Sequence, residues 1–139
     1  MGFLLDTNVV SEPLKRNANP HVLERIAALN PTRCFLSTLT LGELRKGIES
    51  AKEVTHKHKL EAWLVNQLVP RFESRIYAID TEVADRWGRM IAQTPRPLPV
   101  VDSLLAATAL THDLILATRN VRDFADIAGL RLYDPWSDT

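Results

Sequence analysis

The sequence predicts an α/β fold with a mainly parallel β-sheet. Short apolar runs of strand length alternate along the chain with longer segments of helical periodicity. The first run, residues 2–5, stops at Asp6-Thr7-Asn8, as a buried strand does where it ends at a polar edge. The chain has 139 residues, close to the usual size of one domain, so we expect residues 1–139 to form a single domain.

Each expected element follows from periodicity and from turn residues. We expect strands at 2–5, 33–37, 75–79, 114–117 and, at one edge, 130–133. We expect helices at 8–14, 20–30, 41–51, 55–71, 83–94 and 103–112, with a short turn or helix at 121–128. Thr40-Leu41-Gly42-Glu43 matches a capping box, in which Thr40 caps the helix and Glu43 reaches back. The proline-rich residues 95–99 form a connector that cannot be helical.

Composition excludes some classes of protein and leaves others open. The 17 basic and 17 acidic residues give zero net charge, which lends no support to nucleic-acid binding but does not exclude a local basic patch. The single cysteine, Cys34, cannot form a disulfide framework and fits a reducing cytoplasm. No apolar stretch is long enough to cross a membrane, and no basic region precedes the first apolar run. We therefore expect a soluble cytoplasmic protein.

Four acidic residues follow expected strands or begin expected helices: Asp6, Glu43, Asp102 and Asp123. Taken singly, each has a structural explanation as a helix cap, a capping-box partner or a turn residue. In a parallel sheet, however, strand ends and helix starts share one edge, which would bring the four acids together. Clustered carboxylates repel one another unless a cation neutralises them, and oxygen ligands favour Mg²⁺ or Mn²⁺.

Asp80 shows the limit of this reasoning. It also follows an apolar strand and precedes a threonine, so the sequence gives no physical reason to prefer Asp6 as a ligand. We interpret Asp80 as a helix cap, because the helix after it is rich in charged residues typical of a solvated surface.

Four motifs occur in order along the chain. They are Leu4-Leu5-Asp6-Thr7-Asn8, Leu41-Gly42-Glu43-Leu44, Asp102-Ser103-Leu104-Leu105-Ala106-Ala107-Thr108-Ala109 and Ala117-Thr118-Arg119-Asn120-Val121-Arg122-Asp123-Phe124. Together they resemble the signature of PIN domains, and more closely VapC-type toxins of bacterial toxin–antitoxin pairs, including the FitB-like branch. The resemblance runs from Phe3 to Trp136. It implies a three-layer αβα sandwich, a metal-dependent ribonuclease that uses Mg²⁺ or Mn²⁺, a homodimer, and an antitoxin that blocks the site.

The resemblance also implies roles for particular residues. Asp6, Glu43 and Asp102 match the acidic metal site, and the fourth position falls at Asn120 in some relatives and at Asp123 in others. We favour Asp123. The resemblance gives supporting roles to Thr7, Asn8, Thr118 and Asn120. Three basic residues near the acids in sequence, Arg119, Arg45 and Arg16, are candidates to hold flanking RNA phosphates or are solvated surface charges.

Two rival functions remain open at this point. A phosphotransferase with Asp6 as nucleophile needs a second acid where Asn8 stands and gives Glu43 no role. A PIN-like module that binds nucleic acid or a partner without cutting has no sequence feature against it except the acids themselves. If the toxin interpretation holds, the antitoxin groove is expected over Val9, Val10 and Leu14 and over the 41–51 helix.

Overall fold

Five parallel strands form the centre of the molecule in a computed structural model that describes residues 1–137. Their order is β3-β2-β1-β4-β5. The strands are β1 (Phe3–Leu5), β2 (Cys34–Ser37), β3 (Ile76–Tyr77), β4 (Ile115–Ala117) and β5 (Leu132–Tyr133). Leu4 pairs with Phe35 on one side and with Leu116 on the other, so β1 is the middle strand. The expected parallel sheet and the final edge strand are confirmed, and β3 is shorter than the predicted 75–79.

The helices occupy the segments that periodicity predicted. They are α1 (Thr7–Ser11), α2 (Pro20–Ala27), α3 (Thr38–Glu49), α4 (Val54–Trp63), α5 (Val69–Phe72), α6 (Thr81–Gln93), α7 (Val100–Thr111) and α8 (Val121–Phe124). The predicted 55–71 helix is α4 and α5 joined by a π-helical turn at Leu64–Leu68. This turn directly precedes Pro70, which has no N–H for the regular helical hydrogen bond.

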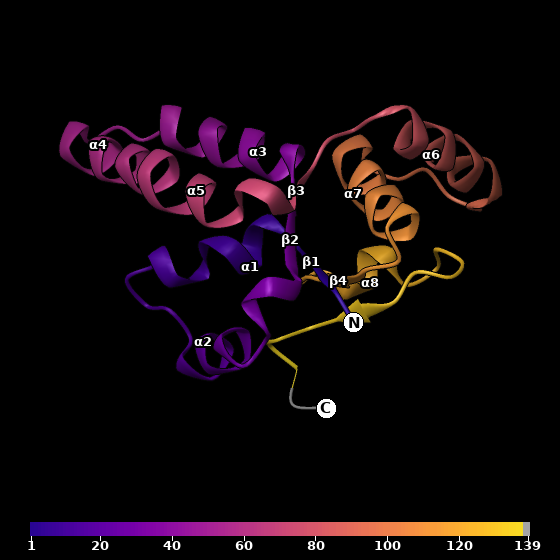
Figure 1. The fold of residues 1–139 in the computed structure, drawn as a ribbon, viewed down its shortest axis with the longest axis horizontal. Helices are drawn as coiled ribbons and strands as arrows, with labels where there is room; N and C mark the ends of the chain where they lie inside the picture. The colour runs from indigo at the N-terminus through magenta and orange to yellow at the C-terminus, as the bar shows by residue number, and fades with distance from the viewer. Residues whose placement is uncertain (138–139) are drawn as a thin grey trace.

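The helices cover both faces of the sheet. Alternate residues of β1 point to opposite faces: Leu4 packs with α6 and α7 residues, whereas Leu5 packs with residues of α1, α3 and the α4–α5 segment. The same alternation places Leu116 with the first cluster and Ala117 with the second. Figure 1 shows the strands between α1–α5 on one side and α6–α8 on the other. This arrangement confirms the three-layer αβα sandwich.

The start of α3 differs from the prediction. The N-cap is Ser37, whose hydroxyl accepts a hydrogen bond from the Leu39 N–H at 3.1 Å, so Thr40 lies inside the helix and is fully buried. The capping box at Thr40 is therefore wrong. Its physical reason is that β2 runs directly into α3 without a loop, so the last strand residue serves as the cap. Glu43 is consequently released from a capping role.

Two smaller expectations concern Cys34 and the membrane. Cys34 is buried against the sheet, and burial raises the pKa of its thiol, as expected for a small core residue. Among residues 1–137, none of the helices combines the length and the apolar character needed to traverse a bilayer.

Candidate active site

Asp6 lies at the carboxyl end of the middle strand, where the order of strands reverses. Its backbone N–H donates to the Ala117 carbonyl at 2.9 Å, which continues the β1–β4 pairing to the last residue. Its side chain is only 6% exposed. The Thr7 N–H donates to Oδ1 at 2.7 Å, and the Thr118 hydroxyl donates to Oδ2 at 2.8 Å. Asp6 is thus both the N-cap of α1 and a carboxylate fixed from β4.

Polar groups from the ends of β1 and β4 hold this carboxylate in place. The Asn8 amide nitrogen lies 3.5 Å from both Asp6 Oδ2 and Thr118 Oγ1, and its oxygen accepts from the Arg119 N–H at 3.2 Å. The Thr118 hydroxyl in turn accepts from the Asn120 N–H at 3.1 Å. The structure therefore brings Asn8 and Thr118 to Asp6 through their side chains, whereas Asn120 contributes its backbone and exposes its side chain.

Glu43 comes to the same edge from α3. Its side chain is exposed, and Oε1 accepts a hydrogen bond from the Thr7 hydroxyl at 2.6 Å. Thr7 therefore touches two of the predicted acids at once, one with its backbone N–H and the other with its hydroxyl. Sequence reasoning named Thr7 as a supporting residue but gave no sign that it bridges Asp6 to Glu43, because the contact joins residues far apart in sequence.

Asp102 and Asp123 reach the site from the other side of the sheet. Asp102 lies in the first turn of α7, which has no side-chain cap, and is half-buried. Asp123 lies in α8, just beyond the end of β4, and is exposed. The N-terminal ends of helices favour negative charge, which suits both positions.

The four acids lie within one another's electrostatic field. Burial raises the pKa of Asp6 above its ordinary value, and the charge of Glu43 raises it further against the hydrogen bonds from Thr118 and Thr7. Burial also raises the pKa of Asp102, and Asp6, Glu43 and Asp123 each add repulsion. In the described residues, none of the four forms a salt bridge with Lys or Arg. The edge thus carries uncompensated negative charge.

The donor set suits a hard cation that keeps part of its water shell. All four candidate ligands are carboxylates, which favour Mg²⁺ or Mn²⁺ over softer metals. Within residues 1–137, no three Asp, Glu, His or Cys side chains come close enough to form a complete ligand cage. Mg²⁺ is usually held by one or two carboxylates, with water and phosphate oxygens completing its octahedron. The four acids fit that mode of binding and do not fit an all-protein cage.

Asp80 and the three basic candidates take distinct positions. Asp80 caps α6 by accepting the Val83 N–H at 3.0 Å and is exposed, as predicted. Arg119 begins beside the site, and its guanidinium lies 5.2 Å from the Trp136 ring centre. Arg45 is held by Glu61 at 2.7 Å and by Glu49 at 3.5 Å. Arg16 lies in the exposed loop after α1.

Sequence reasoning missed one residue that contacts the site's supporting elements. Arg96, in the proline-rich connector, donates to Asp126 and to the backbone of Asp123. A lone arginine between two prolines just upstream of a predicted acid was the available signal. Without the fold, nothing paired it with residues thirty positions later.

Comparison with known proteins gives the family. Residues 3–130 match the family model described as PIN domain. Toxin FitB of Neisseria gonorrhoeae is 36% identical over 141 residues, covering 98% of this chain and 99% of its own. The tRNA(fMet)-specific endonuclease VapC of Salmonella typhimurium is 33% identical, covering 95% and 96%. A structure of FitAB bound to the IR36 DNA fragment superposes with a TM-score of 0.91 at 29% identity, covering 99% and 97%. The chain belongs to the PIN domain family.

Proposed function

We propose that this chain is a divalent-metal-dependent endoribonuclease that acts in the cytoplasm as the toxin of a toxin–antitoxin pair. The observation that carries the proposal is the buried carboxylate of Asp6, which shares one sheet edge with Glu43, Asp102 and Asp123. Relatives named toxin FitB and tRNA(fMet)-specific endonuclease VapC support the same function. Asn8 stands where a phosphotransferase would need its second acid, which speaks against that rival.

The carboxylates of Asp6, Glu43, Asp102 and Asp123 are the proposed ligands of Mg²⁺ or Mn²⁺. When bound, the cation supplies Lewis-acid activation of water and stabilises charge on the phosphodiester. The chain's own groups set the geometry: Thr118 and Asn8 fix Oδ2 of Asp6, while Thr7 fixes Oδ1 and orients Glu43. Second-shell hydrogen bonds of this kind commonly decide how well a metal site works.

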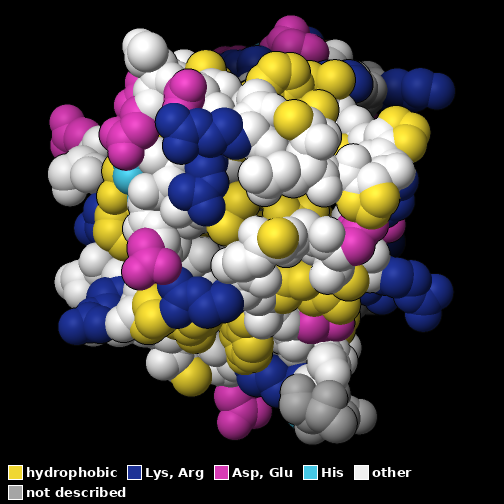
Figure 2. Space-filling model, turned by 90° about the vertical axis from the view of Figure 1, so that its right-hand side faces the viewer, with side chains coloured by type: hydrophobic (Ala, Val, Ile, Leu, Met, Phe, Trp, Pro, Cys, Tyr) yellow, Lys and Arg dark blue, Asp and Glu magenta, His cyan; other side chains and the backbone are white. Residues whose placement is uncertain are grey.

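Arg119 is the strongest of the three candidates for binding an RNA phosphate beside the acids. Its backbone N–H is tied to Asn8, and its exposed guanidinium lies over the Trp136 ring. Arg45 is the weakest because Glu61 and Glu49 already occupy it. On the face beside α6, basic and acidic side chains are interspersed (Figure 2), so a few placed arginines rather than a broad basic patch would hold the RNA.

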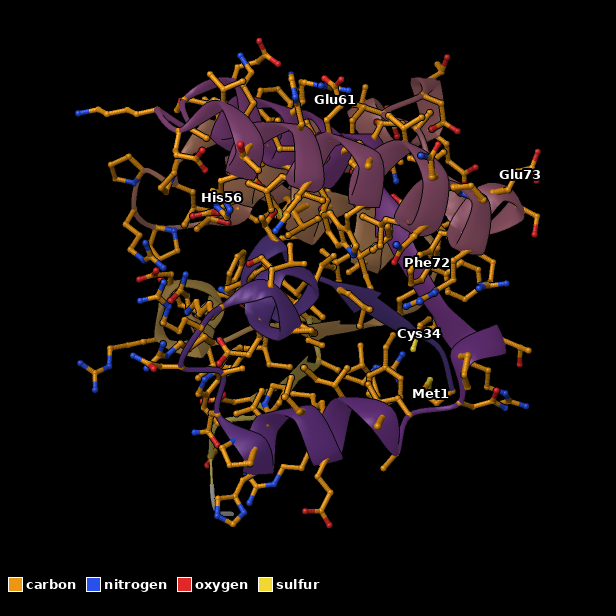
Figure 3. All side chains as sticks on the ribbon, turned by 90° about the vertical axis from the view of Figure 1, so that its left-hand side faces the viewer. Met1, Cys34, His56, Glu61, Phe72 and Glu73 are labelled. Atoms are coloured by element: carbon orange, nitrogen blue, oxygen red, sulfur yellow. The ribbon has the colours of Figure 1, made fainter. Side chains whose placement is uncertain are left out.

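An apolar groove of about 340 Å³ is the proposed docking site for the antitoxin. It lies between α1, α2 and the α4–α5 segment; Val9 and Val10 line it as expected, whereas Leu14 and α3 do not. Figure 3 shows Cys34 and Phe72 on the inner side and Glu61 on the outer face. Ile26→Glu should abolish binding of the product of the adjacent small reading frame, while Val65→Glu, at an apolar position outside the groove that is 50% exposed, should not. Equal binding by both variants would reject this site.

A second apolar surface, beside Asp102, is the proposed homodimer interface. Val100 and Val101 are 63% and 39% exposed. Val101 also lines a groove of about 650 Å³ whose α3 wall contains Gly42 and Gly47, and a Cβ at either glycine would meet nothing within 4 Å. Such a wall leaves room for a closely packed second copy. Sedimentation should show a dimer for the wild type and a monomer for Val101→Glu; a dimeric variant would reject this interface.

The experiment that tests the function is RNA cleavage by the purified chain with Mg²⁺, with Mn²⁺ and with chelator. Asp102→Asn should abolish cleavage. The matched control is Glu82→Gln, because Glu82 is the acid in the first turn of α6 as Asp102 is in the first turn of α7. The control should cut like the wild type.

Two outcomes would reject the proposal. Cleavage that survives both chelator and Asp102→Asn would mean that the four acids are not the site. Tight binding of RNA or antitoxin with no cleavage of any RNA tested would favour the non-cleaving binding module instead.

A further inference from the structure

Arg96 joins two parts of the chain that each carry a predicted site acid. Its Nε and Nη2 donate to the two carboxylate oxygens of Asp126 at 2.8 and 2.9 Å. Nη2 also donates to the backbone carbonyl of Asp123 at 2.5 Å. One guanidinium therefore grips both the backbone and a side chain of the segment that begins with α8. We call these three hydrogen bonds the Arg96 clamp.

The segment it grips has few other restraints. α8 is only four residues long and has no side-chain cap, and Asp123 itself is exposed. Phe124 and Ile127 anchor the segment to the core, 1% and 4% exposed, but they fix its apolar side rather than the edge that bears Asp123. On the other side of the clamp, the connector continues directly into the first turn of α7, which contains Asp102.

We propose that Arg96 is a positioning residue that keeps Asp123 at a fixed place relative to Asp102. This inference rests on the proposed function and adds a residue outside the acidic cluster to it. Arg96 contacts neither acid's carboxylate through a hydrogen bond; it acts through the Asp123 backbone and through Asp126. The planar fork of arginine suits this task, since two parallel bonds to one carboxylate fix direction as well as distance.

The clamp should matter more for activity than for stability. The Arg96 and Asp126 side chains are 40% and 38% exposed, and ion pairs so open to water contribute little to the free energy of unfolding. A catalytic group displaced by about 1 Å, in contrast, can lower the rate about 100-fold. A purely structural ion pair would not show this imbalance.

The first test compares Arg96→Gln and Arg96→Lys with a matched control. Arg89→Gln removes another arginine–aspartate pair, Arg89–Asp85 at 2.8 Å, from the exposed face of α6. Both Arg96 variants should lower kcat by roughly 10- to 100-fold, with KM and Tm close to wild type, since lysine keeps the charge but loses the fork. Arg89→Gln should change none of these quantities. Wild-type kcat in both Arg96 variants would overturn the proposal.

A double-mutant cycle with Asp123→Asn shows whether Arg96 acts through Asp123. If it does, Arg96→Gln should add no further loss in kcat to Asp123→Asn. Losses that multiply would mean that Arg96 acts independently, for example by binding an RNA phosphate, and would overturn the proposal. Full activity of Asp123→Asn would overturn it as well, because the clamp would then hold a residue without a role.

Two further readouts do not depend on cleavage. Asp126→Asn should weaken Mn²⁺ binding, measured by calorimetry without RNA, to the same degree as Arg96→Gln, and should speed hydrogen exchange at the amides of 121–127. If Arg96 instead binds RNA, Asp126→Asn would leave Mn²⁺ affinity and exchange unchanged. Failure of the proposed function is distinguishable, because the wild type itself would then neither cut RNA nor bind Mn²⁺.

Discussion

The ends of β1 and β3 look alike in sequence and differ in the folded protein. Each strand stops at an aspartate followed by a threonine, Asp6-Thr7 and Asp80-Thr81. Asp6 ends the middle strand, is buried, and accepts a hydrogen bond from β4's continuation at Thr118. Asp80 follows an edge strand, is exposed, and does no more than cap α6.

The difference teaches that position in the sheet decides what a strand-end acid does. Chain connections leave β1 toward β2 on one side, while β4 returns on its other side, so the strand order reverses there. Open α/β sheets bind ligands at such a reversal, because the flanking helices diverge and leave a crevice. At the edge strand β3 only one neighbouring strand exists, and an acid there faces solvent.

The largest expected difference is in catalysis. Asp6→Asn should lower kcat/KM for RNA by about 100-fold or more, because a metal ligand contributes several kcal/mol of transition-state stabilisation. Asp80→Asn should leave kcat/KM unchanged, since asparagine caps a helix as well as aspartate does. Initial rates of RNA cleavage measure both. Equal losses in the two variants would erase the distinction between the strand ends.

The threonines after the two acids sharpen the comparison. Thr7→Val removes the hydroxyl that donates to Glu43 at 2.6 Å and should lower kcat/KM about 10-fold, the usual scale for a group that orients a metal ligand. Thr81→Val removes an exposed hydroxyl and should have no effect on cleavage. The measurement is again the initial rate, with the melting temperature as a check on folding. A Thr7→Val enzyme as fast as wild type would mean that Glu43 needs no orientation.

The smallest effects are on stability, and they have opposite signs. Asp80→Ala should lower the free energy of unfolding by about 1 kcal/mol through loss of a cap. Asp6→Asn should raise it by about 1 kcal/mol at pH 7, as neutralising a strained active-site group often does. Urea denaturation measures both. A destabilised Asp6→Asn would mean that the Thr7 and Thr118 hydrogen bonds outweigh burial and repulsion.

The pH dependence of that gain follows from the direction of the Asp6 pKa shift. Because the pKa is raised in the folded state, the folded chain holds the proton more tightly than the unfolded chain does. The wild type therefore loses stability as pH rises from the unfolded value, about 4, through the folded pKa. The advantage of Asp6→Asn should be full at pH 7 and shrink as pH falls below about 4. An advantage that grows on acidification would reverse the assigned cause.

Much of the fold could be predicted from sequence, because local patterns carry it. Alternation across β1 and the helical stripe of α6 are visible in the sequence, and both elements occur where expected. The start of α3 was mispredicted because two hydroxyl residues, Ser37 and Thr40, offer equally good local signals for a cap. Only the length of β2, set by its pairing with β1 and β3, selects Ser37.

The candidate site was predictable as a set of acids but not as a network. A motif can name Asp6 and Glu43, yet the Thr7 bridge between them and the Arg96 clamp join residues from separate elements. Such contacts depend on strand order and helix placement, which no local pattern encodes. The same limit explains why Asp6 and Asp80 could not be told apart before the sheet order was known.

The measurement that tests the central claim most directly is Mn²⁺ binding by calorimetry to the wild type, Asp6→Asn and Asp80→Asn. The account predicts that the wild type and Asp80→Asn bind with the same affinity and that Asp6→Asn binds at least about 10-fold more weakly. Wild-type affinity in Asp6→Asn would contradict it, since the end of the middle strand would then not be the metal site.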